Sequence, residues 1–96
     1  AGRYIADGTT GNTTSDYSLY LGANTKALAD NDQNEIVIGY NATGIGSNSV
    51  VLGSDAITTT ALKGDVGIGT TNPGAKLEVA GHIWQTGTGN SVFIGE

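Results

Sequence analysis

Short clusters of apolar residues recur along the chain, separated by stretches rich in Gly, Asn, Ser and Thr. The clusters contain β-branched or aliphatic residues, lack a 3.6-residue period and end at a glycine, so each is predicted to be a short β-strand. They are SLYLG (18–22), EIVIG (35–39), SVVLG (49–53) and SVFIG (91–95), with DVGIG (65–69) as a degenerate copy.

The clearest repeat is 14 residues long and separates Gly39 from Gly53. The units NEIVIGYNATGIGS (34–47) and NSVVLGSDAITTTA (48–61) each hold one strand, a turn and a second short piece, at 42–45 and 56–59. One unit is too short to enclose a core, whereas stacked units bury a continuous apolar stripe. We therefore predict an all-β fold of parallel β-roll or β-solenoid rungs.

Alternation along a strand sends successive side chains to opposite faces. If Ile36 and Ile38 face the interior of their own rung, Val37 faces outward together with Val51, and Tyr20 and Phe93 occupy equivalent places. Stacked rungs would then expose an apolar ridge, which soluble monomers rarely tolerate. We expect three copies to bury this ridge and form an intertwined homotrimeric fibre; a monomeric two-layer solenoid is the alternative.

The residues predicted to form the core and the trimer interface are Leu19, Tyr20, Leu21, Ile36, Val37, Ile38, Val50, Val51, Leu52, Val66, Ile68, Leu77, Val79, Val92, Phe93 and Ile94. Glycines are predicted to set the turns because glycine permits a positive φ or a close backbone approach. They are Gly22, Gly39, Gly53, Gly69 and Gly95.

Four segments follow from these patterns. Residues 1–16 are predicted to be an irregular connector, 17–61 the repeats, 62–89 a connector with a turn and a strand, and 90–96 the start of a further repeat. The strand in 62–89 is predicted from the alternation of Lys76 and Glu78 with apolar neighbours, after a turn rich in Gly, Thr, Asn and Pro.

Composition excludes several classes of protein. The chain has 96 residues, 38% of them hydrophobic and 14% charged, with a formal net charge of −5. Four Lys and Arg residues are too few for a nucleic-acid surface. No apolar run is long enough to insert into a membrane. Disulfides and thiol chemistry are absent because there is no cysteine. The regular apolar clusters argue against disorder.

Little in the sequence indicates catalysis, and we predict that the chain is not an enzyme and holds no cofactor or metal. His82 is the only histidine, and no nucleophile motif surrounds any serine. Three copies of His82 meeting on a trimer axis would offer an ion site, but a histidine on a strand face is the simpler interpretation. The run of polar residues at 30–35 lacks the glycine and spacing of a calcium loop, so a solvated turn is expected.

Two segments resemble known families. VGIGTTNPGAKLEVAGHI (66–83) resembles a connector of phage tail fibres and related trimeric fibre proteins, and the units at 34–61 are similar to head repeats of trimeric autotransporter adhesins. The resemblance implies a homotrimer of parallel β-roll rungs within an extended fibre. The chain departs from a regular repeat, because 17 residues separate Gly22 from Gly39 and 16 separate Gly53 from Gly69.

The expected function is therefore structural. We predict a shaft segment of a trimeric extracellular fibre, on a virion tail or a bacterial surface, that displays a distal receptor-binding module. The alternative is an adhesin head that binds cell-surface glycans through exposed turns at 8–16, 30–34, 54–60 and 85–90. Polymerisation end to end through an unpaired strand edge is a third possibility.

Overall fold

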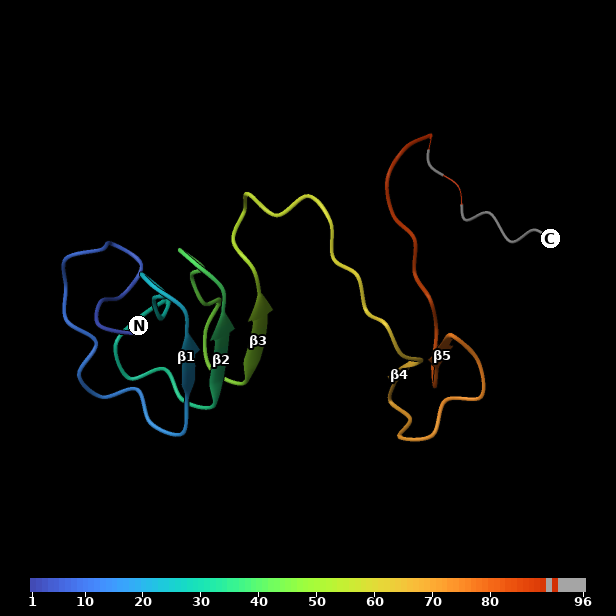
Figure 1. Ribbon diagram of the computed structural model, residues 1–96, viewed down its shortest axis with the longest axis horizontal. Helices are drawn as coiled ribbons and strands as arrows, with labels where there is room; N and C mark the ends of the chain where they lie inside the picture. The colour runs from blue at the N-terminus through green and yellow to red at the C-terminus, as the bar shows by residue number, and fades with distance from the viewer. Residues whose placement is uncertain (90, 92–96) are drawn as a thin grey trace. The chain divides into compact units, whose positions relative to one another are not determined.

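The computed structural model describes residues 1–89 and 91, and within them the protein is all-β and without helices. Its strands are β1 (Leu19–Leu21), β2 (Glu35–Ile38), β3 (Ser49–Leu52), β4 (Val66–Ile68) and β5 (Leu77–Val79) (Figure 1). The chain divides into two compact units, Ala1–Thr59 and Thr60–Glu96. The predicted strand with Val92, Phe93, Ile94 and Gly95 lies outside the described residues.

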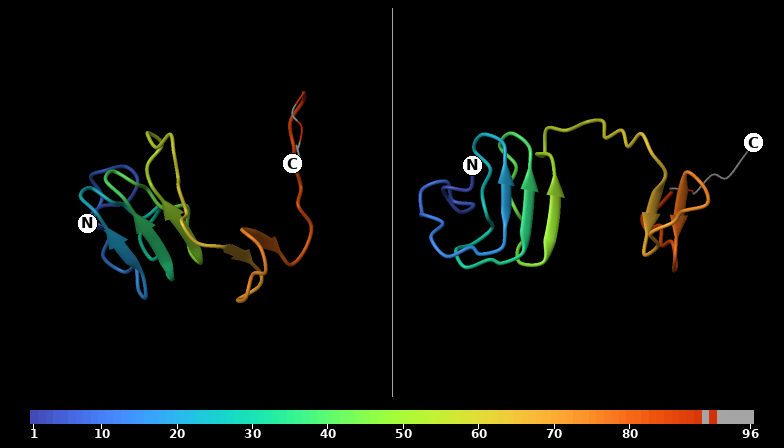
Figure 2. Two further views of the ribbon diagram at one scale, coloured as in Figure 1. Left: turned by 45° about the vertical axis from the view of Figure 1, so that its right-hand side comes forward. Right: turned by 60° about the horizontal axis from the view of Figure 1, so that its bottom comes forward.

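The first unit is built on a parallel sheet of three strands in the order β1-β2-β3 (Figure 2). The register pairs Tyr20 with Val37 and Val37 with Val51. Residues that the repeat makes equivalent therefore lie side by side. The parallel direction requires the chain to return across the sheet between strands.

A second row of backbone crosses one face of this sheet. Its members, residues 2–5, 25–28 and 42–45, are called return segments below. Parallel bridges join Ile5 to Ala27 and Lys26 to Thr43. Residues 42–45 were predicted as the second piece of a repeat unit, and they occupy this row. The matching piece at 56–59 forms no bridge with any described residue.

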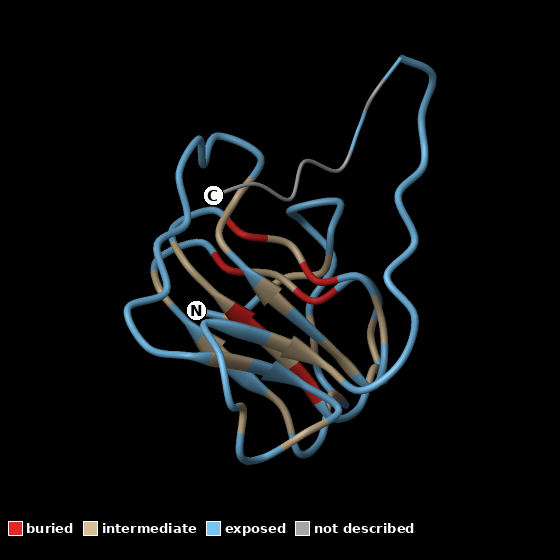
Figure 3. Ribbon diagram, turned by 90° about the vertical axis from the view of Figure 1, so that its right-hand side faces the viewer, coloured by how far each residue is buried: buried red, intermediate tan, exposed pale blue. Residues whose placement is uncertain are grey.

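The interior lies between the sheet and the return segments (Figure 3). Val37 comes from β2, while Ala27 and Ala42 come from the return segments, and all three are fully buried. Thr25 and Glu35 are the buried polar residues. Small side chains on the return segments let the two layers approach, so the interior is narrow.

The predicted orientation of the strands is wrong. Val37, expected on the outer ridge, is 0% exposed. Ile36 and Ile38, expected inside, alternate with it and face away from the interior. Ile36, Val37 and Ile38 are all apolar, so the alternation along the strand does not show which of them faces the interior. The side chain of Glu35 shares the face of Val37 and is buried with it, toward the return segments.

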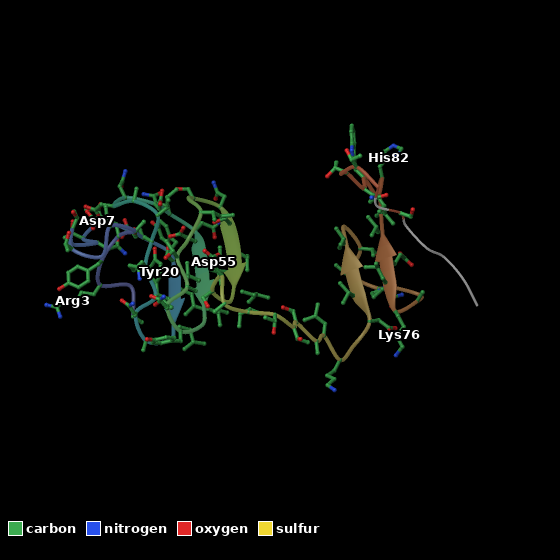
Figure 4. All side chains as sticks on the ribbon, turned by 90° about the horizontal axis from the view of Figure 1, so that it is seen from above. Arg3, Asp7, Tyr20, Asp55, Lys76 and His82 are labelled. Carbon is green, nitrogen blue, oxygen red and sulfur yellow. The ribbon has the colours of Figure 1, made fainter. Side chains whose placement is uncertain are left out.

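The neighbouring strands follow the same corrected orientation. Tyr20 and Val51 are partly buried, while the residues on either side of each are exposed. Tyr20 therefore points toward the interior rather than onto an outer ridge (Figure 4).

Left-handed residues form the corners between strands and return segments. Asn24 and Asn41 have φ of 58° and 61°, and Asn34 and Asn48 have φ of 56° and 60°. Asn tolerates this region because its side chain bonds locally. Each pair also stacks: Asn24 Nδ2 donates to Asn41 Oδ1 at 2.6 Å, and Asn34 Nδ2 donates to Asn48 Oδ1 at 2.9 Å.

Glycine closes each strand where adjacent backbones approach. Gly39 has a φ of 124°, and a Cβ there would lie 3.1 Å from the Cα of Gly53. Gly22, with a φ of 123°, would place its Cβ 2.9 Å from the carbonyl carbon of Gly39. Any larger residue would separate the strands at this corner.

The second unit contains one parallel pair, β4 with β5. Val66 pairs with Leu77 and Ile68 with Val79, so the four aliphatic side chains share one face. Lys76 Nζ and Asp65 Oδ1 are 3.8 Å apart beside the pair. None of the described residues in this unit is buried.

Candidate functional site

The most prominent surface feature of the first unit is the outer face of its sheet. We call this the aliphatic face; its members are Leu19, Leu21, Ile36, Ile38, Val50 and Leu52. Leu21, Val50 and Leu52 are 57%, 59% and 58% exposed. Because the strands are in register, these side chains form a continuous patch rather than isolated apolar residues.

Parallel sheets are seldom bare on one side. They occur almost always with both faces covered by other elements. Here the return segments cover one face, and no other part of the first unit covers the second face. The aliphatic face is therefore an apolar surface of the first unit with no polar side chain among its members.

The second unit carries a smaller surface of the same kind. Ile68 and Leu77 are 55% and 56% exposed, beside the half-buried Val66 and Val79. A two-stranded pair of this length is not stable by itself in water. All four residues were predicted as core or interface positions, and the structure brings them together on one face.

A buried carboxylate lies inside the first unit, at Glu35. Tyr20 Oη donates to Glu35 Oε1 at 2.9 Å, and the Gly46 backbone N–H donates to Oε2 at 2.9 Å. The carboxylate thus ties β1 and β2 to the turn after the third return segment. Burial raises the pKa of the Tyr20 phenol, and the neighbouring Glu35 adds to this effect.

This contact depends on a glycine. A Cβ at Gly44 would overlap the carboxylate oxygens of Glu35. The expectation that residues 30–35 form a solvated turn is therefore wrong for Glu35, which is fully buried. A signal was available in the sequence: Glu35 aligns with Ser18 and Ser49 in the other strands, and the unit that has Glu also has Gly44.

Two other carboxylates hold loops of the first unit in place by accepting hydrogen bonds. Asp30 Oδ1 accepts from the backbone N–H of Thr13 at 2.7 Å and of Thr14 at 2.8 Å, which joins residues far apart in the chain. These bonds, with one from the Thr13 hydroxyl, hold the pKa of Asp30 well below its usual range. Its role is to fix the loop around Thr13 against the turn at residue 30.

Asp7 organises a tighter turn at the opposite end of the same loop (Figure 4). Its carboxylate accepts from the Thr10 hydroxyl and from the backbone N–H groups of Thr9 and Thr10, both at 2.8 Å. The Thr10 bonds are the main cause that lowers the Asp7 pKa to about 2. Both aspartates are structural acceptors with their oxygens already engaged.

The remaining candidates for chemistry are dispersed. His82 is exposed in the second unit, outside the strands. Within residues 1–89, no group of three or more His, Cys, Asp or Glu is placed to hold a metal ion. No helix long and apolar enough to cross a bilayer occurs in the described part of the chain.

Among the described residues, three aromatic side chains are exposed, two in the first unit and one in the second. Tyr17, Tyr40 and Trp84 are 87%, 74% and 85% exposed. Tyr17 has a φ of 57°. It occupies the corner position before β1 that Asn34 occupies before β2 and Asn48 before β3. An aromatic residue in the left-handed region is strained.

Neither protein-family models, nor curated proteins, nor solved structures give a match to this chain.

Proposed function

We propose that the protein is a structural shaft segment of a trimeric extracellular fibre, in which three copies bury their aliphatic faces against one another. The observation that carries this proposal is the aliphatic face itself. Its Leu and Val side chains are exposed and its Ile side chains partly exposed, and all lie in register on one side of a parallel sheet.

Energetics favour association. The interior of the first unit buries only Ala27, Val37 and Ala42 as apolar residues. Full burial of one Val, Leu or Ile side chain contributes about 1.5–3 kcal/mol. More aliphatic surface is therefore available on the aliphatic face than inside the unit. A closed arrangement of three copies buries that surface in every copy and leaves no apolar face open to further, unlimited association.

Such an assembly suits a spacer. Opening it at any point requires breaking parallel strand pairing within a copy and aliphatic packing between copies together. The resemblance of residues 66–83 to tail-fibre connectors favours a fibre on a phage particle. The shaft would hold a receptor-binding module away from the particle.

Two leucines of equal exposure test the proposal. Leu19 lies on the aliphatic face and Leu28 on a return segment, and each is 47% exposed. We expect Leu19→Asp to convert trimers to monomers in size-exclusion chromatography with light scattering, because three charges would be buried together. Leu28→Asp is the matched control and is expected to leave the mass unchanged. An unchanged trimer in Leu19→Asp would refute the interface.

Glycan binding is the second candidate, and the exposed Tyr17 and Tyr40 favour it. Exposed aromatic faces are suited to stacking on sugar rings. An adhesin head of this kind would bind immobilised cell-surface glycans on an array, and Tyr17→Ala with Tyr40→Ala would abolish the signal. Absence of binding by the intact protein would leave the shaft as the function.

A further inference from the structure

The layer of return segments in the first unit does not extend over β3. A hollow of about 510 Å³ lies there, lined by Lys26, Asn41, Thr43, Ile45, Val51, Gly53 and residues 54–56. Over β1 and β2 the corresponding space is covered by return segments. Over β3 it is open, and Ile45 at its rim is 67% exposed.

The backbone bordering this hollow presents hydrogen-bonding groups to which a further strand could pair. Lys26 uses both its N–H and its C=O on the third return segment, donating to Ala42 O at 3.0 Å and accepting from Gly44 N at 2.8 Å. Thr43, between these two partners, directs its N–H and C=O to the other side. Neither group has a backbone partner among the described residues. A further extended segment would find both groups in position.

The chain's own continuation does not take this place. Residues 54–57 form a turn in which Ile57 N donates to Ser54 O at 3.1 Å, and the Ile57 side chain lies over Gly53. The corner also differs. Asn24 and Asn41 each lie two residues after the glycine that closes their strand, and both adopt the left-handed conformation. Asp55 lies two residues after Gly53 but does not adopt it.

An unpaired extended segment follows directly. Residues 58–62, Thr-Thr-Thr-Ala-Leu, are exposed and form no hydrogen bond with another described residue. β-Branched threonines favour the extended conformation that a sheet edge accepts. Leu62 is 62% exposed and would be covered by docking in a hollow. One copy thus has both an open acceptor edge and a donor segment that its own turn keeps away.

We propose that residues 58–62 of one copy dock at the Thr43 edge of a second copy and complete the layer of return segments over its β3. This inference rests on the proposed self-association and adds to it a reciprocal exchange of segments. Each copy donates one segment and accepts one, which closes around three copies without unpaired ends. The exchange links the copies through backbone pairing as well as through the aliphatic faces.

Cysteine variants test the exchange directly, because the chain has no cysteine of its own. Full-length Thr43→Cys, carrying an affinity tag that changes its mass, is unfolded and refolded together with untagged Thr60→Cys. A short bismaleimide then joins neighbouring thiols. The expected product is a mixed dimer on a denaturing gel. Tagged Thr43→Cys with Thr9→Cys, an exposed threonine of the loop, is the matched control and is expected to give none.

A double variant distinguishes exchange from self-closure. Thr43→Cys/Thr60→Cys is expected to give covalent dimers and trimers. If it loses its thiols while remaining a covalent monomer, the segment docks on its own chain and the exchange is refuted. If no cross-link forms while light scattering still gives a trimer, the exchange is refuted and the proposed function stands. A monomer in light scattering refutes both.

Discussion

Both units contain paired parallel strands, but among the described residues only those of the first unit include buried ones. Both contain in-register parallel strands with aliphatic residues at alternate positions. In the first unit, return segments whose buried residues are small cover one face and create an interior with Val37 and Glu35 fully buried. In the second unit, the loop between β4 and β5 lies against the Gly67 and Glu78 side of the pair, where the Gly74 N–H donates to Glu78 Oε1 at 3.0 Å, and no described residue is buried.

The difference shows that strand pairing alone does not create a core in this chain. A return segment with Ala or Gly facing the sheet is also required, because only small residues let the two layers close. The described part of the second unit encloses no buried residue, and its four aliphatic side chains are half-buried or exposed there.

The largest effect is expected from disturbing the interior at Gly44. Gly44→Ala forces a methyl group into the Glu35 carboxylate and should cost about 3 kcal/mol of unfolding free energy. Denaturant unfolding measures it. Gly64→Ala is the control, since nothing lies within 4 Å of a Cβ there.

A double-mutant cycle identifies the cause. In the Glu35→Ser background, which introduces the residue found at the equivalent Ser18 and Ser49, Gly44→Ala should cost much less, because the carboxylate is gone. Equal costs of Gly44→Ala in both backgrounds would contradict the assigned contact.

Truncation of a valine compares the units directly. Val37→Ala removes fully buried methyl groups and should lower the unfolding free energy by about 2 kcal/mol. Val79→Ala, in β5, should cost clearly less under conditions where the protein is monomeric, because Val79 is only partly buried. Equal losses would show that the second unit has an interior of its own.

A stabilising substitution is expected at Tyr17. The left-handed region costs a residue other than Gly or Asn roughly 1–2 kcal/mol. Tyr17→Asn removes this cost and places an amide next to Asn34, extending the stack of Asn34 on Asn48. We expect the unfolding free energy to rise by about 1 kcal/mol. Tyr40→Asn, an exposed residue without a positive φ, should change little; a loss of stability in Tyr17→Asn would show that the tyrosine ring packs.

The smallest effect is the dependence on acid. The folded-state pKa values of Asp7 and Asp30 lie below the ordinary value of about 3.9. Their contribution to stability is therefore present above about pH 4 and is lost as the pH falls toward 2. The difference in melting temperature between the protein and Asp30→Asn should shrink over this range, and a constant difference would contradict the role of the Asp30 carboxylate.

Much of the local structure could be predicted from the sequence. The strands at 35–38 and 49–52 and the parallel register between them follow from apolar clusters separated by 14 residues and closed by glycine. The all-β class is confirmed. These features are encoded by neighbours in the chain, where propensity and turn chemistry act directly.

The orientation of the strands could not be predicted in the same way. Ile36, Val37 and Ile38 are all apolar, so the alternation has no polar side to mark. The orientation depends on what lies across the interior, on Gly44 and Ala42, which come from a different part of the unit. The sequence did not predict that residues 56–59 leave the layer of return segments. Both 42–45 and 56–59 begin with Ala and contain Thr and Ile, but 56–59 has no glycine and its corner residue is Asp55 rather than Asn.

The most direct test is the molar mass of the intact protein in solution at micromolar concentration, measured by sedimentation equilibrium. Burial of the aliphatic faces predicts three times the mass of one chain, independent of further dilution over the micromolar range. A folded species with the mass of a single chain would show that these leucines, isoleucines and valines remain in contact with water, and would contradict the proposed shaft.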